Sequence, residues 1–147
     1  MKKFLLLFLT IVLTSCATTQ VVSNSVASES YRASYDEVWT KVIRFFATNQ
    51  ISIGTLEKDS GIVTLKGDNL DSQLMNQYCE ADENNGFLEV LLYGNVMGSV
   101  NVIDEGGIVT VTVNTRYNTI HAYGQNYYPA RPCASKGVFE RSILDSI

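Results

Sequence analysis

The chain has 147 residues, a formal net charge of −4 at neutral pH and one histidine. Neutralisation of phosphate groups needs a basic surface, so this acidic chain excludes nucleic acid as an expected partner. Eight tyrosines, only two prolines and long runs of alternating polarity predict a folded, β-rich chain and exclude a disordered one.

The N-terminal segment has the pattern of an export signal. Lysines precede an apolar run over residues 4–13, which is shorter than the roughly 20 residues that span a bilayer. The run ends in Leu13-Thr14-Ser15-Cys16, which resembles the lipobox of bacterial lipoproteins. This resemblance implies cleavage before Cys16 and acylation of the cysteine. A plain secretory signal that is cut elsewhere is the alternative.

Lipidation of Cys16 would divide the chain into three parts. Residues 1–15 form the signal peptide, residues 16–25 a lipidated tether, and residues 26–147 a single α+β domain. The acyl chains, palmitate included, would anchor the protein in a membrane. Ala17 follows the cysteine, and in enterobacterial lipoproteins a residue other than aspartate there goes with transport to the outer membrane. We therefore expect the protein at the periplasmic face of the outer membrane.

The other two cysteines, Cys79 and Cys133, are predicted to form a disulfide. Export would place both in an oxidising compartment, where a pair of thiols tends to join. A metal or redox site is the competing interpretation, but neither a Cys-x-x-Cys pattern nor a nearby cluster of ligands supports it. We expect no metal and no cofactor.

The domain is predicted to begin with a strand over 26–31, followed by a helix from Ser34. Ser34 and Glu37 have the spacing of a capping box, and the helix should fade near Asn49. Apolar side chains then recur every three or four residues, as on one face of a helix. These are Tyr35, Val38, Trp39, Val42, Ile43 and Phe46.

The rest of the chain alternates mainly as strands do. A hairpin is predicted from 51–56 and 62–66, and a short helix over 70–78 lies within the acidic stretch 67–86. Strands over 87–93, 98–104 and 108–117 should then form an antiparallel meander with glycine turns between them.

Three tyrosines near the end of the chain are candidates for a contact surface. Tyr123, Tyr127 and Tyr128 lie in a predicted loop, where they could bind a partner or cover a small core. After this loop, Ser135 is predicted to cap a short C-terminal helix.

The first part of the domain resembles the helix-grip module. Ser34-Tyr35-Asp36-Glu37-Val38-Trp39, the strand 51–53 and the segment 57–63 are similar to this module in the C-subunit lipoprotein of the outer-membrane β-barrel assembly machinery. The resemblance covers residues 31–66 and implies a helix gripped by an antiparallel sheet. We expect an α+β fold in which a sheet of about five to six antiparallel strands packs against one long amphipathic helix, with a short C-terminal helix added.

No catalytic set stands out in the sequence, so we expect the protein not to be an enzyme. His121 has no motif around it, although carboxylates between residues 68 and 83 leave an enzymatic site as a remote hypothesis. Our first hypothesis is a role in envelope assembly or structure through contacts with an envelope protein. The alternative is a protein that binds a small molecule or lipid between helix and sheet, with Trp39 and the tyrosines at the mouth of the cavity.

Overall fold

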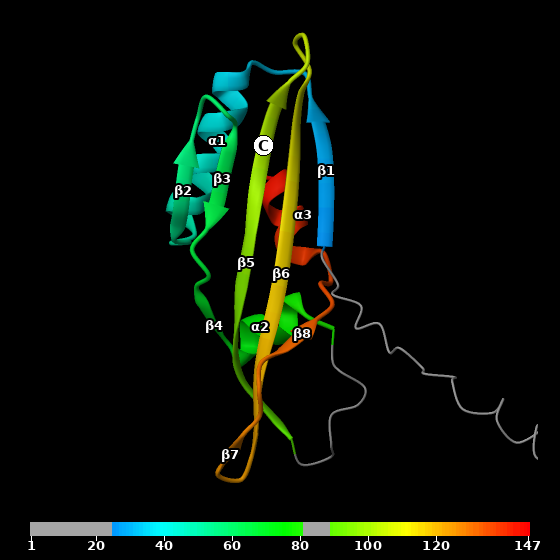
Figure 1. Cartoon of the computed structure of the whole chain (residues 1–147). Helices are drawn as coiled ribbons and strands as arrows, with labels where there is room; N and C mark the ends of the chain where they lie inside the picture. The colour runs from blue at the N-terminus through cyan, green and yellow to red at the C-terminus, as the bar shows by residue number, and fades with distance from the viewer. Residues whose placement is uncertain (1–24, 81–88) are drawn as a thin grey trace, which may run out of the picture.

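The computed structural model describes residues 25–80 and 89–147 (Figure 1). The predicted signal peptide, Cys16 and nearly all of the predicted tether lie outside these residues. The strands are β1 Ser25–Tyr31, β2 Ile53–Glu57, β3 Ile62–Leu65, β4 Asn69–Asp71, β5 Val90–Asp104, β6 Val109–Tyr123, β7 Asn126–Tyr127 and β8 Arg131–Cys133. The helices are α1 Tyr35–Thr48, α2 Ser72–Tyr78 and α3 Val138–Leu144. In the described part of the chain, no helix has the length and apolar character needed to cross a membrane.

The strands form one antiparallel sheet in the order β1-β6-β5-β3-β2, and β4, β7 and β8 pair with the long central strands. β5 and β6 have 15 residues each and make a single hairpin. The chain reverses at Gly106 and Gly107, whose φ angles of 70° and 94° favour glycine. This hairpin is the axis along which the other elements are placed (Figure 1).

The helices lie on one face of the sheet, and no described helix covers the opposite face (Figure 1). Alternation along β6 follows from this arrangement, because Val109, Val111 and Val113 are buried on the helix side while the threonines between them are partly exposed. Val113 pairs with Val100 of β5, which pairs with Val63 of β3. These valines form the floor of the hydrophobic core, and the helices close it.

The predicted fold class is wrong in its sheet and in its helical cover. The sheet has eight strands instead of about five to six. No single long helix packs on it, because the cover is divided among three short helices of 14, 7 and 7 residues. The apolar face of the long β5–β6 hairpin has to be covered along the whole length of the hairpin. α2 and α3 cover the part of this face that α1 does not reach.

Two glycines explain why the sequence suggested shorter strands. A turn is predicted at Gly94 and a new strand from Gly98, yet both residues lie inside β5. A Cβ at Gly98 would collide with the main-chain oxygen of Asn114, and one at Gly94 would collide with that of Asn118. These glycines therefore permit a close approach of β5 to β6, and the two predicted strands are one.

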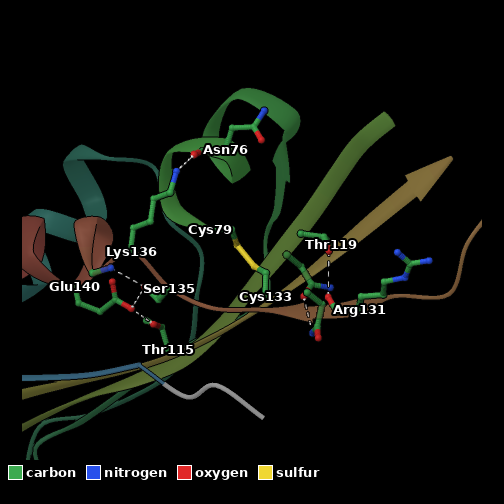
Figure 2. The surroundings of a disulfide bond; sticks show 12 residues. Asn76, Cys79, Thr115, Thr119, Arg131, Cys133, Ser135, Lys136 and Glu140 are labelled. Atoms are coloured by element: carbon green, nitrogen blue, oxygen red, sulfur yellow. Dashed lines mark hydrogen bonds between the residues drawn. A yellow bond between two sulfur atoms is a disulfide. The ribbon is translucent and has the colours of Figure 1, made fainter. Parts of the chain in front are cut away.

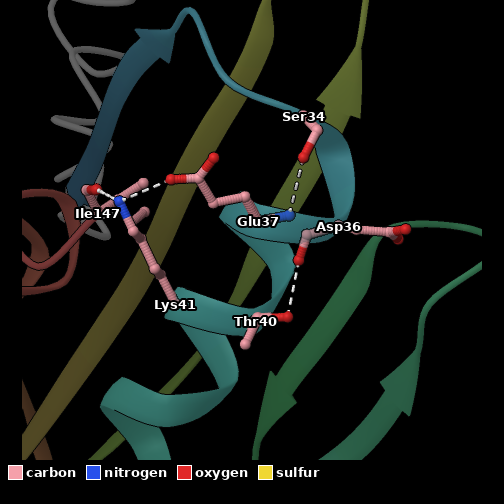
Figure 3. A network of polar contacts seen from close by, with 6 residues as sticks. All are labelled: Ser34, Asp36, Glu37, Thr40, Lys41 and Ile147. Carbon is pink, nitrogen blue, oxygen red and sulfur yellow. Dashed lines mark hydrogen bonds and ion pairs between the residues drawn. The ribbon is translucent and has the colours of Figure 1, made fainter.

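The start of α1 confirms the predicted serine cap. The Glu37 N–H donates to Ser34 Oγ at 3.3 Å (Figure 3). The Glu37 carboxylate pairs with Lys41 at 3.3 Å, so it does not complete a reciprocal capping box. Lys41 Nζ also donates to the main-chain oxygen of Ile147 at 2.6 Å, which ties α1 to the segment after α3 (Figure 3).

Candidate functional site

The structure confirms the predicted disulfide. Cys79 follows α2 and Cys133 ends β8, and a bond joins their sulfur atoms with the Cα atoms 5.8 Å apart (Figure 2). Both cysteines are buried. The bond therefore connects a helix to a strand that are far apart in the sequence and fixes α2 at the edge of the sheet.

Main-chain hydrogen bonds reinforce this connection. The Glu80 N–H donates to the Ala134 oxygen at 2.9 Å, and the Lys136 N–H donates to the Tyr78 oxygen at 2.8 Å. Lys136 Nζ also donates to the Asn76 oxygen at 2.6 Å (Figure 2). The segment between β8 and α3 is thus held against the end of α2 by the disulfide and by these bonds.

A buried carboxylate positions the beginning of α3. Glu140 is fully buried, and its Oε1 accepts hydrogen bonds from Thr115 Oγ1 and from Ser135 Oγ, the latter at 2.8 Å (Figure 2). The prediction that Ser135 caps this helix is wrong. The N-cap is Gly137, whose φ of 74° is left-handed, and the Gly137 N–H donates to Ser135 Oγ at 2.9 Å.

Tyr117 lies in the same buried region. Burial, with a smaller contribution from the Glu140 charge, raises the pKa of the Tyr117 hydroxyl well above its usual value. Within the described residues, the Tyr117 hydroxyl and Glu140 Oε2 have no hydrogen-bond partner. The carboxylate is therefore held mainly through Oε1, and α3 depends on Ser135 and Thr115 for its placement.

A cleft of about 620 Å³ opens where the three helices meet strands β4 and β5. We call it the interhelical cleft. Its lining comes from α1, α2, α3, β4, β5 and the loops after α1 and before β4. The lining residues are Phe45, Asn49, Gln50, Ile51, Ser52, Asp68, Asn69, Leu70, Leu74, Tyr78, Val96, Phe139 and Ser142.

Aromatic side chains form the walls of the interhelical cleft. Phe139 of α3 contacts Phe45 of α1 and Tyr78 of α2, with ring centroids 6.3 and 5.5 Å away. Both contacts are edge-to-face, the arrangement that aromatic pairs prefer. Burial also raises the pKa of the Tyr78 hydroxyl. The walls are thus apolar and are fixed by packing between all three helices.

The rim of the interhelical cleft is polar. Asp68 Oδ2 accepts a hydrogen bond from the Ser52 N–H at 2.7 Å, and Asn49 Nδ2 donates to the Phe45 oxygen at 2.8 Å. The predicted end of the helix near Asn49 is confirmed, since α1 stops at Thr48. The left-handed residue after it is Gln50, with φ 55°.

The structure does not place Trp39 or the three candidate tyrosines at the mouth of this cleft. Trp39 is buried in the core. Tyr123, Tyr127 and Tyr128 lie at the far end of the β5–β6 hairpin, beyond β8 (Figure 1). The residues that sequence reasoning missed are Phe45, Tyr78 and Phe139. Phe45 is outside the apolar stripe predicted for α1, and no motif surrounds the other two.

The three tyrosines do not face the same way. Tyr127 is 72% exposed and pairs with Ala122, which places it on the face of the sheet opposite the helices. Tyr123 is the next residue along β6, so it faces the helix side. Tyr128 is partly buried, with the Arg131 guanidinium 5.2 Å from its ring centre.

Other exposed apolar side chains share the face of Tyr127. Val90 pairs with Ala122 and is 59% exposed, and Tyr93 pairs with Ile120 and is 43% exposed. We call Val90, Tyr93 and Tyr127 the hairpin-end patch. Regular alternation would place Val90 and Tyr93 on opposite faces of β5. The register shift between Leu91 and Tyr93 brings both to the face of Tyr127, and the sequence pattern does not indicate it.

Two further observations bear on chemistry. His121 is buried, and its Nδ1 has no hydrogen-bond partner among residues 25–80 and 89–147. No group of three metal-ligating side chains gathers in that part of the chain. In comparisons with known proteins, no family model and no curated protein matches this chain.

Proposed function

We propose that the protein is a lipid-anchored binding protein without a catalytic role, held at the periplasmic face of the outer membrane, and that its domain binds a small molecule or lipid, through an apolar part of that ligand, in the interhelical cleft. The cleft carries this proposal. Its volume of about 620 Å³ is within the range of ligand pockets, roughly 300 to 1,000 Å³. Aromatic walls with a polar rim are also typical of such pockets.

The cleft walls are fixed independently of a ligand, which supports a preformed site. α2 is attached to the segment before α3 by the Cys79–Cys133 disulfide. The buried hydrogen bonds of Glu140 fix the beginning of α3. A site that is already ordered loses less conformational entropy when a ligand binds, and the smaller entropic cost favours tighter binding.

The proposed anchor rests on the lipobox resemblance that ends at Cys16. Residues 17–24 would separate the lipidated cysteine from β1. Even fully extended, eight residues reach at most roughly 26 to 29 Å. The domain would therefore remain close to the bilayer, where an apolar ligand could pass between the membrane and the cleft.

Binding of the neutral dye Nile red tests the proposed cleft. The soluble domain with its disulfide intact should bind the dye and increase its fluorescence. Ser142→Trp, which adds a large side chain to the lining, should weaken binding about tenfold or more. Gln73→Trp is the matched control, because Gln73 is exposed on the short helix α2 and does not line the cleft. An equal loss of Nile red affinity in both variants, or no binding of the dye to the wild type, would contradict the proposal.

The hairpin-end patch favours a second candidate function, contact with an envelope protein. Apolar side chains that gather on an exposed sheet face mark interaction sites more often than scattered ones do. A photoreactive amino acid at Tyr93 or Tyr127 should crosslink to the same envelope protein in cells. Ile103 is the control, since it is 52% exposed near the opposite end of β5. Identical products from Ile103 would contradict a contact through the patch.

A further inference from the structure

The interhelical cleft carries charge of one sign. Asp68 is the charged residue of its lining, and no lysine, arginine or histidine of the described chain is among the lining residues. Lys66, two residues before Asp68, is outside the lining. The Ser52 N–H holds the Asp68 carboxylate at the rim through the 2.7 Å hydrogen bond. A bound molecule therefore meets negative charge at the rim and apolar side chains below it.

The end of α1 adds to this negative potential. The aligned peptide dipoles of a helix place partial negative charge at its C-terminus. α1 has 14 residues and, in its described last turn, no basic side chain. The N–H groups of Asn49, Gln50 and Ile51 donate to three of its last main-chain oxygens, so the helix end contributes less negative potential than Asp68 does. Asn49 and Gln50, the next residues after α1, both line the cleft. The helix end and Asp68 thus act on the same part of the rim.

Resting on the proposed function, we propose that the ligand of the interhelical cleft is a cationic amphiphile, with an amine or quaternary ammonium group at Asp68 and the end of α1 and an apolar chain against Phe45, Tyr78 and Phe139. The charge of the rim and the apolar character of the walls match the two ends of such a molecule. A fatty acid would place its carboxylate beside Asp68 and the helix C-terminus, where like charges repel. The site therefore selects by head-group charge as well as by chain.

Three probes with the same decyl chain separate head group from chain. Decyltrimethylammonium, decanol and decanoate are each used below their aggregation or solubility limits to displace Nile red from the soluble domain at low salt. The cation should bind about tenfold more tightly than decanoate, with decanol between them. Raised salt should reduce the difference, because ions screen charges near the surface.

Asp68→Asn tests the charge while an oxygen remains to accept from the Ser52 N–H. It should reduce the affinity for decyltrimethylammonium about three- to fivefold and leave that for decanol unchanged. Asp59→Asn is the matched control, because Asp59 is exposed and does not line the cleft. Decanoate binding as tightly as the cation, or no effect of Asp68→Asn, would overturn the cationic ligand and leave the binding function standing. Failure of all three probes to bind would overturn the proposed function and this inference with it.

Discussion

The ring of Tyr78 in α2 meets the ring of Phe139 in α3 edge to face, with centroids 5.5 Å apart. Tyr78 directly precedes Cys79, and Phe139 directly precedes Glu140. The ring pair therefore joins the disulfide to the buried carboxylate across one wall of the interhelical cleft. The shape of this wall should depend on both of these features.

Replacement of Cys79 and Cys133 by serine should destabilise the domain and weaken dye binding. The disulfide closes a loop with a sequence separation of 54, which on the entropic model is worth about 4 kcal/mol in the free energy of unfolding. Chemical denaturation should show a loss of about 2 to 5 kcal/mol. Reductant should lower the denaturation midpoint of the wild type but leave that of the double variant unchanged. Equal midpoints for the oxidised wild type and the double variant would contradict a stabilising bond.

Glu140→Ala should lower the free energy of unfolding by about 3 kcal/mol, because the buried hydroxyls of Ser135 and Thr115 lose the acceptor that they share. Glu140→Gln keeps an oxygen for the two donors and should cost less than the alanine variant. Glu37→Ala serves as an exposed control and should change the free energy of unfolding by less than about 1 kcal/mol. If urea denaturation gives the same loss for Glu140→Ala and Glu37→Ala, the buried carboxylate does not position α3.

Stability should fall at alkaline pH because of Tyr31. Burial, followed by the Glu29 charge, raises the pKa of Tyr31 from 10.0 to about 12. The unfolded chain therefore loses this proton at lower pH than the folded chain. The contribution of Tyr31 to the free energy of unfolding is complete below pH 10 and is lost as the pH rises through 12. Urea midpoints measured across this range should decline less steeply for Tyr31→Phe than for the wild type. Parallel slopes would show that Tyr31 is not responsible.

Cys16→Ser should move the protein from the membrane fraction to the soluble periplasm, because the variant has no thiol to acylate. The measurement is fractionation of cells that produce the wild type or the variant at the same level. Mass spectrometry of the wild type should find acyl chains on Cys16. A Cys16→Ser protein that stays with the membrane would show that something other than a lipid holds it there.

Much of the local structure could be predicted from the sequence. The cap at Ser34, the glycine turn between β5 and β6, and the Cys79–Cys133 pair each depend on a few residues with strong preferences. Each of these features forms in the structure. They share a simple physical cause, in that the residue type itself restricts what the chain can do at that position.

The number of strands could not be predicted in the same way. Gly94 and Gly98 have the preferences of turn residues, but here they allow the close approach of β5 to β6. That role depends on the partner strand and is invisible in the local pattern. β7 and β8 are similar, because two or three residues become a strand only by pairing with β6.

The candidate site was also hidden from sequence reasoning. Phe45, Tyr78 and Phe139 come from three helices, and nothing in the local sequence around each of them indicates a cleft. Asp68 has no motif around it, and its proposed role depends on its position near the end of α1. Only the packing of the helices brings these residues to one place.

The most direct test of the proposed binding function is two-dimensional NMR of the soluble domain during titration with decanol, the uncharged probe. The account predicts that the largest shift changes map to Leu70, Leu74 and the rings of the interhelical cleft. It also predicts that signals of Val90 and Tyr127 in the hairpin-end patch stay in place. Changes confined to that patch, or no changes at a saturating concentration, would contradict binding in the cleft.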